Sequence, residues 1–166
     1  MNFAAEPMLA MLQSAWTAAG RMAQLLRDEY QALSQADSAA LTGIARDKQV
    51  QMQALEQAQI GWDQLLVASG LPTGNTGMQQ WLGAWRAYHT AGRVRSNIDA
   101  AALWRGLADG LRTIRKLNGI NGAVIAESDR HVRDLLGTLR GNRETRVYGF
   151  DGRNRGYASG QDLATF

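Results

Sequence analysis

The sequence contains no cysteine and only two prolines, Pro7 and Pro72, among its 166 residues. Without cysteine there is no disulfide scaffold, no thiolate metal site and no thiol nucleophile. Scarce proline permits long helices, because a proline inside a helix removes a backbone hydrogen bond and clashes with the preceding turn. No apolar run is long enough to span a bilayer, and the N-terminal segment lacks the basic region of a secretory signal. We therefore expect a cytoplasmic protein without stable membrane insertion.

Histidine is also rare, and the two that occur, His89 and His131, belong to different predicted elements. A metal site needs several ligands at matched spacing, and no such set is present. The acidic residues follow the pattern of exposed helix charges and do not form a carboxylate pair in a pocket. The sequence therefore predicts no catalytic residue, no metal and no cofactor, and we expect a protein that is not an enzyme.

Charge is distributed unevenly along the chain. Residues 1–66 carry four Lys/Arg and seven Asp/Glu, a balance of −3, whereas residues 86–155 carry fourteen and seven, a balance of +7. Such asymmetry suits a nucleic acid, a membrane surface or an acidic protein partner, but it also suits a solvated helix face. Helix-turn-helix and zinc signatures are absent, and the arginines between Arg105 and Arg133 alternate with acids. We therefore expect no nucleic-acid partner.

Apolar residues recur at alternating spacings of three and four, which is the seam of a packed helix. The first seam, which predicts a helix from Met8 to Leu33, comprises Leu12, Trp16, Ala19, Ala23, Leu26, Tyr30 and Leu33. The second, which predicts a helix from Ser38 to Ser69, comprises Leu41, Ile44, Lys48, Met52, Leu55, Gln59, Trp62 and Leu66. The short link at Ser34–Ser38 holds cap-type residues, so these two helices should form an antiparallel hairpin.

The third seam predicts one helix from Asp99 to Arg140, and comprises Leu111, Ile114, Asn118, Asn121, Ile125, Ser128, Val132, Leu135 and Leu139. Leu107 and Leu103 extend it upstream in steps of four. Between the second and third helices, Gly70–Gly77 (GLPTGNTG) is expected to be a loop and Met78–His89 a short helix. We predict an all-α fold: an antiparallel bundle of three long helices with coiled-coil-like packing over residues 1–140. Residues 141–166 have many glycines and charges and few aliphatics, which predicts a flexible basic C-terminal tail.

The stretch KLNGINGAVI, Lys116 to Ile125, places two Asn-Gly pairs inside the third predicted helix. A polar side chain in a helix seam lowers stability but specifies register. Glycine removes bulk and allows another backbone to come close. Asn118 and Asn121 therefore either set the register of the bundle at a tight crossing or line a groove that binds a partner helix.

The motifs, taken in order, resemble the FlgN-type flagellar export chaperones over about Leu25 to Gly152. In the first half, the resemblance is carried by Leu25-Leu26, Glu29, Leu33, Asp37, Leu41, Ile44, Lys48, Leu55-Glu56, Leu65-Leu66 and Gly70-Leu71. In the second half it is carried by Trp104, Asn118, Asn121-Gly122, Ile125, Leu139, Gly141, Tyr148 and Gly152. Trp62 stands where the family often has arginine, and Met78–Ser96 has no counterpart.

The resemblance implies a cytoplasmic type III export chaperone for the hook-associated proteins of the hook–filament junction. Such a chaperone binds their C-terminal helical segments, prevents premature association and delivers them to the cytoplasmic domain of the export gate. We expect these segments to bind Asn118, Asn121, Ile125, Val132, Leu135 and Leu139. In this family an aromatic near the C-terminus contacts the gate, and Tyr148 matches that position, with Phe150 as a second candidate. The heptads alone equally allow a structural coiled-coil or adaptor protein, and a nucleic-acid-binding bundle is a third alternative.

Overall fold

The computed structural model describes residues 5–92 and 97–139. It contains four helices: α1 (Ala5–Gln35), α2 (Ser38–Ala68), α3 (Gly74–Thr90) and α4 (Ala100–Leu139). Within the two described ranges there is no strand, and the predicted all-α class with three long helices is confirmed. None of these helices has the length and apolar character needed to cross a bilayer. The predicted tail, from Gly141 onward, lies outside the described residues.

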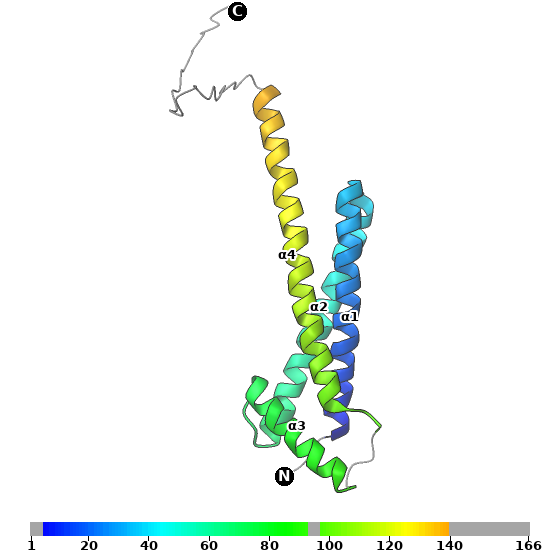
Figure 1. Cartoon of the computed structure of the whole chain (residues 1–166), viewed down its shortest axis with the longest axis vertical. Coiled ribbons are helices and arrows are strands. Elements are labelled where there is room, and N and C mark those ends of the chain that lie inside the picture. The colour runs from blue at the N-terminus through cyan, green and yellow to red at the C-terminus, as the bar shows by residue number, and fades with distance from the viewer. Residues whose placement is uncertain (1–4, 93–96, 140–166) are drawn as a thin grey trace, which may run out of the picture. The chain divides into compact units, whose positions relative to one another are not determined.

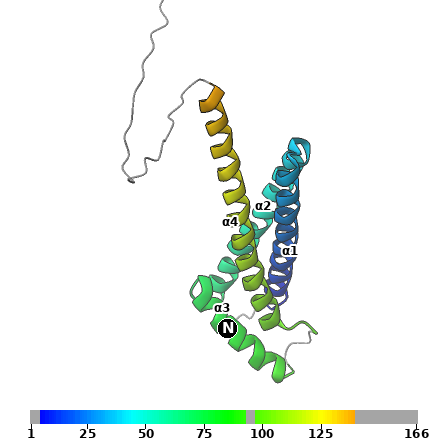
Figure 2. The same ribbon diagram turned by 45° about the horizontal axis from the view of Figure 1, so that its top comes forward.

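Packing divides the chain into two units, residues 1–125 and 126–166, which are described separately. In the first unit, α1 and α2 form the predicted antiparallel hairpin and lie side by side (Figures 1 and 2). The corner is tight because Ala36 takes a left-handed conformation, with φ of 53°, and the Asp37 N–H donates to the Ala32 carbonyl at 3.0 Å. The Asp37 carboxylate then accepts a hydrogen bond from the Ala40 N–H at 2.9 Å and so caps α2.

The core is built around α1, which buries side chains over a wide arc of its surface. Its fully buried residues include Met8, Leu12 and Leu26, and small alanines let neighbouring helices approach between them. Two residues of the predicted seam are exposed instead: Trp16 at 49% and Tyr30 at 47%. The prediction was wrong there because the buried positions follow another alternation of four and three, in which small alanines do not stand out as apolar markers: Met8, Leu12, Ala15, Ala19, Met22 and Leu26.

The first half of α4 crosses the hairpin with two of its glycines, Gly106 and Gly110, against side chains of α1. A Cβ on Gly110 would lie 3.4 Å from the Ala19 Cβ, and one on Gly106 would lie 3.0 Å from the Trp16 Nε1. Just before these glycines, the rings of Trp104 of α4 and Trp62 of α2 meet edge to face, with centroids 5.8 Å apart. The glycines that permit close helix contact are therefore in the first turns of α4.

The start of α4 is capped by Asp99, whose carboxylate accepts hydrogen bonds from the N–H groups of Ala101 and Ala102 at 2.9 and 3.0 Å. These bonds, that from Ala102 foremost, lower the pKa of the Asp99 carboxyl, and the nearby charges of Arg105 and Arg86 add to the effect. Because the folded-state pKa is depressed, the stabilisation by this cap is present at neutral pH and is lost as the carboxyl protonates in acid.

The third helix begins earlier than predicted, at Gly74 rather than Met78, so the loop that was predicted over Gly70–Gly77 ends at Thr73. The N–H of Gly74, a residue with φ of +74°, donates to the Asp63 carboxylate at 3.0 Å. Gly77 is buried, and a Cβ there would lie 1.6 Å from the Pro72 carbonyl oxygen. The two glycines that suggested a loop are therefore required for α3 to fold back onto α2.

We expect Gly77→Ala to destabilise the protein by about 3 kcal/mol, because the added methyl group overlaps a backbone carbonyl that cannot easily move. Gly83→Ala is the matched control, since Gly83 is exposed in the same helix and a Cβ there meets nothing within 4 Å. That control should gain roughly 0.5–1 kcal/mol, the usual benefit of alanine over glycine in a helix. Chemical denaturation of both variants measures the difference, and equal stabilisation by the two would contradict the close approach at Pro72.

Candidate functional site

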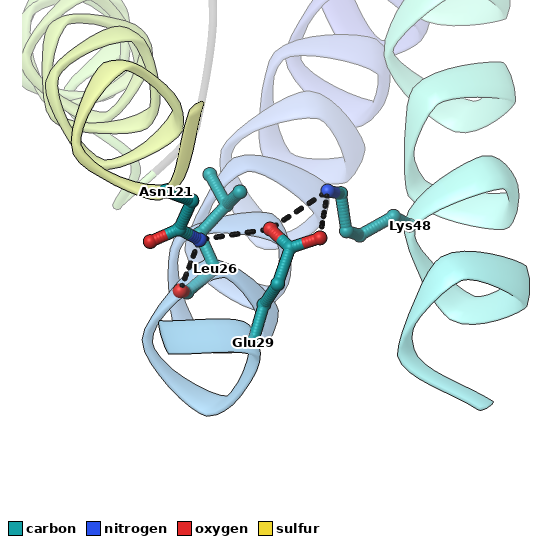
Figure 3. Close-up of polar contacts among 4 residues, drawn as sticks. All are labelled: Leu26, Glu29, Lys48 and Asn121. Carbon is teal, nitrogen blue, oxygen red and sulfur yellow. Dashed lines mark hydrogen bonds and ion pairs between the residues drawn. The ribbon is translucent and has the colours of Figure 1, made fainter. Parts of the chain in front are cut away.

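Asn121 lies where α4 meets the hairpin, and it links α4 to both helices of that hairpin. Its Nδ2 donates to the Leu26 carbonyl and to the Glu29 Oε2, each at 2.8 Å (Figure 3). Glu29 in turn accepts two bonds from the Lys48 Nζ of α2, at 2.8 and 2.9 Å. Asn121 is 2% exposed. Through these bonds the Glu29 carboxylate joins α1, α2 and α4 at the edge of the core.

This three-helix polar cluster (Leu26, Glu29, Lys48 and Asn121) contributes more to the alignment of the three helices than to the free energy of unfolding. The side chains of Glu29 and Lys48 are 15% and 25% exposed, so their charges are largely removed from water. The desolvation cost of such a pair offsets much of its attraction, whereas removing one partner leaves the other uncompensated. Sliding α4 by one residue would take Asn121 away from its acceptors, which makes the cluster a register device.

The orientation of the Asn121 amide follows from its neighbours. Both groups within reach are acceptors, a carbonyl and a carboxylate oxygen, so the amide must present its nitrogen to them. The Oδ1 is buried and has no hydrogen-bond partner among the described residues. Only a donor-bearing side chain of this length fits the position without repelling Glu29.

The two asparagines of the Asn-Gly stretch have different environments. Asn118 is exposed, whereas Asn121 is buried, so the predicted seam through Asn118 and Ile125 was wrong for the packed face. The face that packs alternates by three and four in another phase, and comprises Leu103, Leu107, Gly110, Ile114, Leu117, Asn121 and Val124. The predicted seam and the packed face share Leu103, Leu107, Ile114 and Asn121. Gly110 concealed the packed phase because glycine does not count as an apolar residue.

The glycines beside these asparagines do not mark a tight crossing. A Cβ on Gly119 or on Gly122 would meet nothing within 4 Å. Of the two readings of this stretch, the contacts of Asn121 support the register role. Asn118 is free of that role and remains available to a partner.

Beyond Asn121, α4 exposes the apolar residues that were predicted to bind a partner. Ile125, which ends the first unit, is 51% exposed. In the second unit, Val132 and Leu135 are each 52% exposed, and Leu136, which the sequence reasoning missed, is 45% exposed. Leu136 could have been found from its spacing of eleven residues, three helical turns, from Ile125. Leu139 is the last residue of α4, and its side chain lies outside the described part.

Three of the five arginines of α4 form ion pairs within the helix. Arg112 bonds to Asp109, Arg130 to Glu127 and Arg133 to Asp129, at spacings of three or four residues. Ion pairs of this kind are typical of a solvated helix face. These three pairs reduce the unopposed positive charge that a phosphate backbone requires.

The described residues contain no group of three or more His, Cys, Asp or Glu side chains that could hold a metal ion. His89 lies beside the Trp85 ring, with centroids 5.7 Å apart, and His131 is exposed on α4. What these ranges do present are surfaces of long helices, which suit binding to another protein.

Comparison with known proteins gives one family. The family model described as FlgN protein matches residues 1–156 of the chain. No curated protein and no solved structure matches the chain.

We expect Asn121→Asp to destabilise the protein by about 2–4 kcal/mol, because it replaces a donor with an acceptor that faces Glu29 and a backbone carbonyl. Asn118→Asp makes the same chemical change at an exposed position of the same helix and should stay within about 0.5 kcal/mol of the parent. Thermal and urea unfolding of the two variants measure the contrast. A similar loss in both would show that the cluster does not hold α4 in register.

Proposed function

The chain belongs to the FlgN protein family, and we propose below how it binds its cargo. Members of this family are flagellar export chaperones without enzymatic activity, and they bind hook-associated proteins. The family resemblance predicted from the sequence is thereby confirmed. We propose that the chain acts in the cytoplasm, where it covers the C-terminal helical segments of hook–filament junction proteins until export.

The observation that carries the proposal is the apolar surface on the last turns of α4. After Asn121, none of the described α4 residues is buried, yet Ile125, Val132 and Leu135 recur at spacings of seven and three. This is the anchor spacing of a helix that packs against another helix. An amphipathic segment laid along this face would remove apolar groups of both partners from water.

The energetics of such a contact suit a carrier. Burying a large apolar side chain completely contributes about 1.5–3 kcal/mol, so completing the burial of half-exposed residues contributes roughly 1 kcal/mol each. Four residues of α4 are half-exposed in this way: Ile125, Val132, Leu135 and Leu136. Together with their counterparts on the cargo helix, they support a complex that is specific but can still be released. Asn118, exposed two turns before Ile125, can add a hydrogen bond at the edge of the same contact.

Delivery to the export gate is assigned to a different part of the chain. Tyr148 and Phe150, in the sequence RVYGFDGR, lie outside the described residues, so their role rests on the family position and on chemistry. Aromatic side chains are favoured anchors in protein interfaces, and neighbouring Arg146 and Arg153 would steer them toward an acidic rim. Cargo and gate would then contact separate surfaces.

We predict that Val132→Asp combined with Leu135→Asp weakens binding of a junction-protein C-terminal segment at least tenfold, because two charges replace two apolar anchors. Isothermal titration with the full-length chain measures the affinity. Since both residues are half-exposed, the helical circular dichroism and the melting temperature should change little.

The matched control is Ala123→Asp combined with Ala126→Asp, which introduces the same charges at exposed positions on the opposite side of α4. This variant loses more helix propensity than the first, because aspartate replaces alanine, and it should still bind the segment normally. Equal binding by both double variants would place the cargo elsewhere. Unfolding of the first variant alone would show that its residues belong to a core.

We predict that Tyr148→Ala leaves cargo affinity unchanged but weakens binding to the gate's cytoplasmic domain more than tenfold, since removing an aromatic anchor typically costs about 2 kcal/mol or more. Both affinities should be measured on the same preparation, with Tyr157→Ala as a control for another aromatic of the same C-terminal segment. Loss of cargo binding with normal gate binding would reverse the assignment of the two surfaces.

A further inference from the structure

An open groove lies between α3 and the first turns of α4, which the proposed function does not use (Figures 1 and 2). It consists of two adjoining hollows of about 510 and 290 Å³, which share Leu82, Arg86 and Ala101 as lining residues. The α3 wall belongs to the segment that matched none of the motifs of the family resemblance. We call it the α3–α4 groove, and its walls include Leu82, Trp85, Arg86, Ala101, Trp104 and Arg105.

Each helix contributes one large apolar side chain and one guanidinium group to the smaller hollow. Leu82 of α3 and Trp104 of α4 line it and are partly buried. Arg86 of α3 and Arg105 of α4 line it too, and both are exposed. The α3–α4 groove therefore combines apolar surface with positive charge from both of its walls.

The positive charge of these two arginines is not paired within the protein. Among the described residues, neither Arg86 nor Arg105 forms a salt bridge. Asp109, one helical turn after Arg105, is bonded to Arg112 instead. Between Asp63 and Asp99 the sequence contains no acidic residue, so α3 offers no carboxylate to Arg86.

Asp99 is the acidic residue in the wall of the larger hollow, and its carboxylate already has partners. It accepts hydrogen bonds from the N–H groups of Ala101 and Ala102 at the start of α4. Turning toward either arginine would cost α4 this cap. Asp99 therefore offsets only part of the positive charge, and a ligand that brings its own carboxylates complements the rest.

We propose that the α3–α4 groove binds an acidic segment of a partner protein other than the cargo. Carboxylates of the segment face Arg86 and Arg105, because a guanidinium group can bond a carboxylate through two parallel N–H donors. An apolar side chain of the segment rests on Leu82 and Trp104 and completes their burial. A peptide chain suits the site because the two hollows are open and adjoin each other, whereas pockets for small molecules enclose most of their ligand.

The α3–α4 groove is well separated from the surface that we assign to cargo. From Arg105 to Ile125, where the exposed apolar face of α4 begins, the helix rises roughly 30 Å at about 1.5 Å per residue. The cargo face is apolar, whereas the groove selects negative charge. One chain can therefore hold a cargo helix and an acidic segment at the same time.

The experiment measures binding of a fluorescent peptide of repeated Glu-Glu-Leu units to the full-length chain by anisotropy. Arg86→Gln combined with Arg105→Gln should weaken binding at least fivefold, since two ion pairs are lost. The matched control is Arg115→Gln combined with Lys116→Gln, which removes the same charge at exposed positions of α4 outside the groove. This control should bind like the parent, and because all four positions are exposed, both variants should keep the parent melting curve.

A peptide of Gln-Gln-Leu units should not bind, and amide NMR signals of Leu82 and Ala101 should shift with the acidic peptide while that of Ile125 does not. Absence of binding by the acidic peptide overturns the proposal. Equal weakening by the two double variants also overturns it, because that result indicates general attraction to a basic chain. If a junction-protein C-terminal segment displaces the peptide, the groove belongs to the cargo and not to a separate partner.

Discussion

The shared carboxylate of Glu29 is the contact on which the arrangement of the first unit depends. It is bound by Lys48 of α2 from one side and by Asn121 of α4 from the other. These bonds fix the axial register of three helices that could otherwise slide past one another. Apolar packing alone would not do this. Where α4 crosses α1, Gly110 lies against Ala19, and such small residues allow close contact but offer few side-chain atoms that could specify the register.

Asn121 also marks a change in the character of α4. Up to Val124 one face of the helix is buried or half-buried, and from Ile125 to Leu136 the described side chains are exposed. A cluster of large apolar side chains exposed to solvent on a small protein often marks an interaction site. The proposed cargo contact gives this exposure a use, because a helical segment laid along the face would complete the burial of these side chains.

Much of the fold could be predicted from the sequence. The helices placed at Met8–Leu33, Ser38–Ser69 and Asp99–Arg140 lie within a few residues of α1, α2 and α4, because long periodic patterns and the cap at Asp37 mark them clearly. The start of α3 was misplaced, since glycine is read as a loop signal unless the close carbonyl of Pro72 is known. The exposed apolar residues of late α4 were identified for the same reason as the helix itself, namely their spacing.

The sequence by itself determined that the chain is helical, that two of its helices form a hairpin and that it belongs to its family. Those properties follow from local periodicity, capping and residue order, which need no partner helix. Only the tertiary structure decided which phase of α4 is buried, and therefore that Asn121 is a core residue while Asn118 is exposed. A helix with 3.6 residues per turn fits more than one alternation of three and four. The choice is made by the surfaces of the neighbouring helices, here by the Glu29 carboxylate and by Ala19 opposite Gly110.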